Sequence, residues 1–122
     1  MNRRRFRRLV AEALDRLPPE LAERVRNVEM VIEEEPSVEQ LEAEGLDPAE
    51  ETLYGLYEGV PLPEREHNFG MLLPDRITIF SRPLIEDFET ADEIREQIRI
   101  TVIHEIAHFF GMEDDDIEDL GY

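Results

Sequence analysis

Three residues in the last fifth of the chain have the types and the spacing that hydrolytic chemistry requires. The run His104-Glu105-Ile106-Ala107-His108 places two histidines four positions apart, with a glutamate directly after the first. On an α-helix four residues advance about 400°, so both imidazoles project from one face, about one turn apart. Two imidazole nitrogens placed in this way can bind one zinc ion at about 2.0–2.1 Å each. Glu105 then lies beside the ion, where its carboxylate can act as a general base, taking a proton from an attacking water and returning it to a leaving amine.

The residues around this motif favour a helix with one buried side. The neighbouring apolar positions are Val102, Ile103, Ile106, Ala107, Phe109 and Phe110. The alternative is a chance match in which both histidines are ordinary helix residues. We favour a metal site because a half-buried pair of histidines without a metal would be an unusual use of a core helix.

A third protein ligand is expected just beyond this helix. Catalytic zinc takes three protein ligands and keeps a fourth position open for water. Gly111 lies seven residues after His104, and Asp114 lies ten after it, so the run reads H-E-x-x-H-x-x-G-x-x-D. Glycine tolerates the positive φ that ends a helix and turns the chain back toward the metal, so we predict Asp114 as the third ligand. The alternatives are four acidic neighbours and the remaining histidine: Glu113, Asp115, Asp116, Glu118 and His67.

The elements that must position these residues follow from apolar periodicity and from turn residues. Helices are predicted over 4–17, 19–26 and 37–44, with a helical turn over 83–88 and a long helix from residue 90 or 92 to 110. Strands are predicted over 28–33, 53–60 and 76–80. We expect an exposed loop over 61–75 and no further helix in the acidic tail, 112–122. The chain is therefore predicted to be a single α+β domain, 1–122, with a small mixed sheet and a long C-terminal helix that carries the site.

Composition limits the partners. The net charge is −18, and residues 1–26 hold eight of the thirteen arginines, so the rest of the chain is more acidic still. Such a body repels nucleic acid, and no segment has the length and apolarity of a membrane span or a signal peptide. There is no cysteine, which excludes disulfides and thiolate ligands and fits a cytoplasmic protein. We expect a peptide or protein substrate, with neither nucleic acid nor membrane as a partner.

The second half of the chain resembles a bacterial family of small zincin-like metallopeptidases. The resemblance covers about 53–122 and is carried by the segments 55–62, 73–77 and 102–111, by Asp114-Asp115 and by 120–122. It implies a minimal zincin fold, zinc at His104 and His108, and peptidase chemistry. Only eight residues follow Asp114, too few for the methionine turn of metzincins, and no later helix is expected to supply the glutamate ligand of gluzincins.

These observations predict a zinc metallopeptidase in which Glu105 is the general base. The alternative is a metal-stabilised interaction module without turnover. In zincins an edge strand beside the active helix binds extended substrate through backbone pairing. Either 53–60 or 76–80 could be that strand, and the opposing interpretation is an interior strand of a small sheet.

Overall fold

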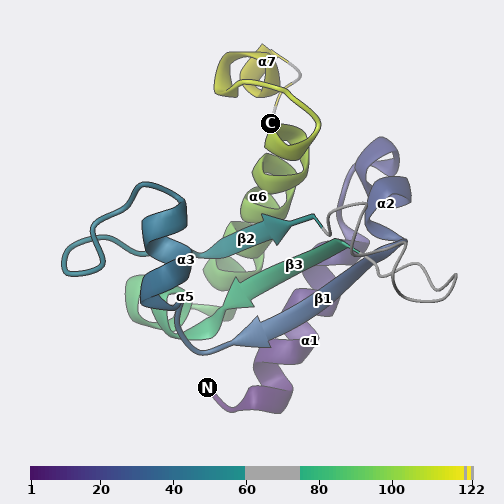
Figure 1. Cartoon of the computed structure of the whole chain (residues 1–122). Coiled ribbons are helices and arrows are strands. Elements are labelled where there is room, and N and C mark those ends of the chain that lie inside the picture. Colours follow the sequence, from purple (N-terminus) through teal and green to yellow (C-terminus); the bar gives the residue numbers. More distant parts are fainter. Residues whose placement is uncertain (60–74, 120, 122) are drawn as a thin grey trace, which may run out of the picture.

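We analysed a computed structural model of the chain, which describes residues 1–59, 75–119 and 121. The described part is mixed α+β, as predicted (Figure 1). Its elements, in chain order, are α1 (Arg3–Asp15), α2 (Pro19–Val25), β1 (Val28–Glu33), α3 (Val38–Ala43), β2 (Gly55–Glu58), β3 (Asp75–Phe80), α5 (Ser81–Asp87), α6 (Ala91–Phe109) and α7 (Asp114–Asp119). The predicted loop over 61–75 lies, except for its last residue, outside the described residues.

The three strands form a small mixed sheet in the order β1-β3-β2. β1 pairs with β3 in parallel, with Val28 opposite Asp75, and β2 pairs with β3 antiparallel, with Tyr57 opposite Ile77. β3 therefore has a neighbour on each side, so the prediction that 76–80 could be an edge strand is wrong. The segment predicted over 53–60 contains an edge strand, β2, which spans Gly55–Glu58 and lies at the opposite edge of the sheet from β1.

α6 and α1 pack side by side against one face of this sheet (Figure 1). The side chain of Thr90 caps α6 by accepting a hydrogen bond from the Glu93 N–H. Isoleucines of α6 and β3, including Ile98 and Ile77, are fully buried together with Phe6 of α1. The guanidinium of Arg99 donates a hydrogen bond of 3.0 Å to the Arg16 carbonyl at the end of α1. The long helix is thus fixed against α1 and the sheet, and its end leads to α7 (Figure 1).

α7 was not predicted, because its sequence has almost no apolar pattern. Only Ile117 is buried, and the other five residues of the helix are acidic. Carboxylates in a first helical turn are stabilised by the helix dipole, and Asp114, Asp115 and Asp116 occupy that turn. A single buried anchor and favourable charge placement are therefore enough to form a short helix that periodicity cannot reveal.

None of the described helices combines the length and the apolar character that crossing a membrane requires.

Candidate metal centre

The two histidines of the motif lie on one face of α6, as their spacing predicts. The ring centroids of His104 and His108 are 6.0 Å apart. Their side chains are 30% and 44% exposed, so both are accessible to an ion from solvent. The opposite side of the helix is held in the core by Val102, Ile103 and Ile106. Because that side is buried, the histidine face must point outward.

A tight turn at Gly111 brings the third predicted ligand to the histidines. Gly111 has φ +87°, and its N–H donates to the His108 carbonyl while the Met112 N–H donates to the Ala107 carbonyl. This pair of bonds is the Schellman motif, which ends a helix with a residue in the left-handed region. Met112 packs on the core, which fixes the direction of the chain as it enters α7.

Asp114, at the start of α7, completes the group. Its Oδ1 lies 2.7 Å from His108 Nε2 and 3.8 Å from His104 Nδ1. Within the described residues, these three side chains are the only set of histidine and acidic groups whose potential ligand atoms converge, all within 4.8 Å of one another. Two imidazole nitrogens and one carboxylate oxygen are donors that zinc accepts, so the residues fit the ion.

The other candidates for third ligand do not join this group. Asp116 accepts a hydrogen bond of 3.1 Å from the Glu113 N–H, which uses its carboxylate to cap α7. Glu113, Asp115 and Glu118 are exposed and are not part of the converging set. His67 lies outside the described residues.

Glu105 faces the edge strand rather than open solvent. Its Oε1 accepts a hydrogen bond of 3.0 Å from the main-chain N–H of Tyr57 in β2. Burial raises the pKa of the Glu105 carboxyl above its ordinary value. The Tyr57 N–H and the two histidines lower the pKa, and Glu44 raises it further. The carboxylate is thus held in one orientation and made more basic than a solvated glutamate, which suits a general base.

Two residues of β2 therefore have a role that the sequence did not reveal. Tyr57 orients Glu105 through its main chain, and Gly55 lets the strand approach the helix. A Cβ on Gly55 would lie only 2.7 Å from Thr101 Cγ2 of α6. Glycine within a strand is a signal of close backbone approach, so Gly55 is the sequence feature that could have identified the contact.

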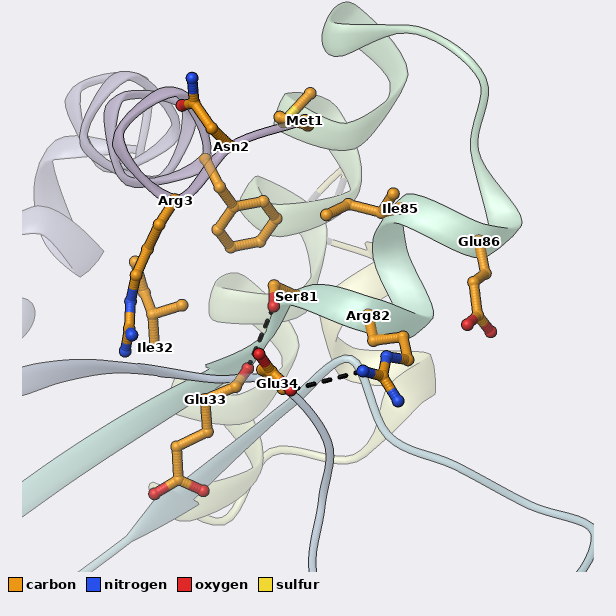
Figure 2. Close-up of a pocket in the computed structure, with 11 residues that line it drawn as sticks. Met1, Asn2, Arg3, Ile32, Glu33, Glu34, Ser81, Arg82, Ile85 and Glu86 are labelled. Atoms are coloured by element: carbon orange, nitrogen blue, oxygen red, sulfur yellow. Dashed lines mark hydrogen bonds and ion pairs between the residues drawn. The ribbon is translucent and has the colours of Figure 1, made fainter.

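A separate hollow lies at the other end of the molecule and contains none of these residues. It has a volume of about 370 Å³ and lies between the start of α1, the end of β1 and α5 (Figure 2). Ser81 Oγ lies 3.4 Å from the Glu33 carbonyl oxygen there, and Arg82 forms an ion pair with Glu34. Its lining includes no histidine and mixes both signs of charge, so it offers no comparable metal site.

A helix with two histidines on one face, a glycine turn and a carboxylate beside the histidines, next to a small mixed sheet, are typical of zincin-type proteins. The sequence matches the family of zincin-like metallopeptidases over residues 25–122, and the chain belongs to that family. The match begins well before residue 53, where the resemblance seen in the sequence begins, and so includes β1 and α3. A comparison with curated proteins finds no match.

Proposed function

We propose that this protein is a zinc-dependent peptidase in which His104, His108 and Asp114 hold the ion and Glu105 is the general base. The observation that carries the proposal is the convergence of these three donors one residue away from a partly buried, oriented carboxylate. Membership in the zincin-like metallopeptidase family supports the same chemistry. When bound, zinc supplies Lewis acidity, which polarises a carbonyl and lowers the pKa of water.

The chain's own residues handle the proton in this proposal. The Tyr57 N–H holds Oε1 of Glu105. The other oxygen of the carboxylate is then available to take the proton of the attacking water and to deliver it to the leaving amine. β2 has no second neighbour among the described strands. An extended peptide would pair with its outer edge at main-chain groups other than the Tyr57 N–H, which is bonded to Glu105.

Glu105→Gln tests the role of the base. Glutamine keeps the size of the side chain and an oxygen that can accept from Tyr57, but it cannot take a proton. We expect zinc content, measured by elemental analysis, to stay at the wild-type level while peptide hydrolysis falls about 10²–10⁴-fold. Glu89→Gln, an exposed acid that lies before α6, is the matched control and should leave both unchanged. Hydrolysis by Glu105→Gln at the wild-type rate would show that another group is the base.

A metal-stabilised interaction module without turnover is the second candidate. It is favoured by the way α7 is attached, because Ile117 is its only buried residue and Asp114 its link to the histidines. A metal bound by His104, His108 and Asp114 would hold α7 against α6. Digestion of a broad peptide library with and without chelator separates the two, since the module would cleave nothing in either condition.

A peptide or protein substrate is the partner that we propose, and the cytoplasm is the location. The net charge of −18 disfavours nucleic acid as a partner. Cell fractionation with an antibody against the protein checks the location.

A further inference from the structure

The end of α6 carries an apolar surface directly beside the candidate metal centre. Phe109 and Phe110 follow His108 in sequence and are 46% and 49% exposed. Their rings touch edge to face, with centroids 5.3 Å apart. The other large exposed apolar side chains of the described residues, Met1 and Val38, belong to other elements. Two exposed aromatic rings next to a polar site are a feature of binding surfaces.

Both rings are held in place from behind. Phe109 stacks on Tyr57 of β2 with a centroid distance of 4.1 Å and an interplanar angle of 27°. Gly59 leaves room for the ring, because a Cβ there would lie 2.9 Å from Phe109 Cε2. Arg24 of α2 lies 4.2 Å from the centroid of Phe110. A ligand that packs on these rings therefore loses little entropy in ordering them.

The same strand residue serves the base and the aromatic surface. The main chain of Tyr57 holds Glu105, while its ring supports Phe109. Phe109 also lies one helical turn beyond Glu105 on α6. A peptide whose scissile bond lies at Glu105 would therefore place a side chain on the helix side of β2, at the ring of Phe109.

The other boundary of the centre is negatively charged. The exposed residues that surround Ile117 in and just before α7 are all acidic: Glu113, Asp114, Asp115, Asp116, Glu118 and Asp119. Asp114 is the proposed ligand, and no described arginine forms an ion pair with any of the other five. Their negative charge attracts cationic ligands at long range.

We propose that the site selects cationic peptides with a large apolar side chain close to the scissile bond. The apolar side chain packs on Phe109, and basic residues of the peptide face the carboxylates of α7. This inference rests on the proposed peptidase function and names its substrate class.

Binding to the zinc-loaded Glu105→Gln protein tests the inference without turnover. The chain has no tryptophan, so the emission of a tryptophan-containing peptide reports the peptide alone. Two short peptides of equal length carry a central tryptophan with arginine or with glutamate on both sides. A third, with alanine between arginines, competes against the first. We expect the arginine–tryptophan peptide to bind at least about tenfold more tightly than either of the others.

Matched variants identify the surfaces responsible. Phe109→Ala, introduced into the same protein, should weaken the arginine–tryptophan peptide about tenfold, and Phe109→Leu should weaken it less. Val38→Ala removes an equally exposed apolar side chain on α3 and should have no effect. The double substitution Glu118→Gln with Asp119→Asn should weaken binding of the arginine-flanked peptides only. Added salt should reduce the difference in affinity between the arginine-flanked and glutamate-flanked peptides. Zinc content is measured for each variant to show that the centre is intact.

The outcomes separate this inference from the proposed function. If Phe109→Ala binds the tryptophan peptide like its parent, or if the glutamate-flanked peptide binds equally well, the substrate class is wrong. Binding as expected, together with no hydrolysis by the wild-type protein, overturns the peptidase function and leaves the peptide-binding surface standing. Hydrolysis of all three peptides at equal rates overturns the selectivity alone.

Discussion

Gly55→Ala should separate β2 from α6 at the point where the strand positions the base. The new Cβ would lie 2.7 Å from Thr101 Cγ2, 3.2 Å from Ile79 Cδ1 and 3.2 Å from the Thr78 carbonyl oxygen. Carbon atoms in normal contact are about 3.5–4.0 Å apart. The contact with α6 is therefore too short by roughly 1 Å. The two contacts with β3 are also short, so they prevent β2 from shifting toward β3, and we expect the strand and the helix to move apart by about that distance.

The expected cost follows from two opposing effects. Overpacking of a well-filled interior typically costs about 1–3 kcal/mol. Replacing glycine also reduces the freedom of the unfolded chain, which returns about 0.4–1 kcal/mol. We therefore expect the free energy of unfolding to fall by about 1–2 kcal/mol. Because Tyr57 lies two residues further along β2, the same displacement should lengthen its bond to Glu105 and lower kcat at unchanged zinc content.

Thr101→Ser provides the matched partner for a double-mutant cycle. Serine removes Cγ2, the closest clashing atom, and keeps the hydroxyl that accepts a hydrogen bond from Gln97 at 3.3 Å. Urea unfolding followed by circular dichroism gives the free energy of unfolding of the parent, both single variants and the double variant. We expect the double variant to be more stable than the sum of the single effects by about 1 kcal/mol. Strict additivity, or a Gly55→Ala protein as stable as its parent, would refute the close packing of β2 on α6.

Two further predictions concern a tyrosine and a helix end. The Tyr54 hydroxyl donates a hydrogen bond of 2.5 Å to Asp87, and this bond raises the pKa of Tyr54 from 10.0 to about 12. The contribution of the bond to the free energy of unfolding is therefore complete below pH 10 and is lost as the pH rises to about 12. Tyr54→Phe should therefore flatten the fall in unfolding free energy over that window, in which the chain has no lysine or cysteine to titrate. Gly111→Ala should lower the free energy of unfolding by about 1–2 kcal/mol, because Gly111 has a positive φ. It should also weaken zinc binding several-fold in a chelator competition, because the turn at Gly111 positions Asp114 beside the histidines. Gly45→Ala carries a similar strain at φ +75° at the end of α3 and should leave zinc affinity unchanged; equal zinc loss in both would contradict this account.

The sequence was most informative where side chains repeat regularly. Apolar residues at three- and four-residue steps predicted α1, and alternation predicted β3. The spacing of His104, His108, Gly111 and Asp114 also predicted which side chains meet, since helix geometry and one glycine turn fix their relation locally. α7 escaped prediction because a single apolar residue has no period.

Contacts between elements that lie far apart in the chain leave no comparable repeat in the sequence. Tyr57 holds Glu105 through a main-chain N–H, a group that every residue except proline has, so residue type could not identify it. Whether 53–60 or 76–80 forms an edge strand depends on which strand β1 pairs with. β1 pairs in parallel with β3, so β3 becomes the central strand and β2 remains at an edge.

The register between β2 and α6 explains why two glycines flank Tyr57. Two residues of a strand advance about 6.6 Å, and four residues of a helix advance about 6.0 Å, so the two elements stay nearly in step. Residues 55 and 57 of the strand, and residue 59 directly after it, accordingly meet 101, 105 and 109 of the helix. At positions 55 and 59 the side chains of Thr101 and Phe109 occupy the space that a Cβ would need, so the chain must have glycine there. At the middle level the strand supplies a donor to the base and a ring to the aromatic surface. Substitutions in β2 should therefore change catalysis and peptide selection together, although no β2 residue belongs to the proposed ligand set.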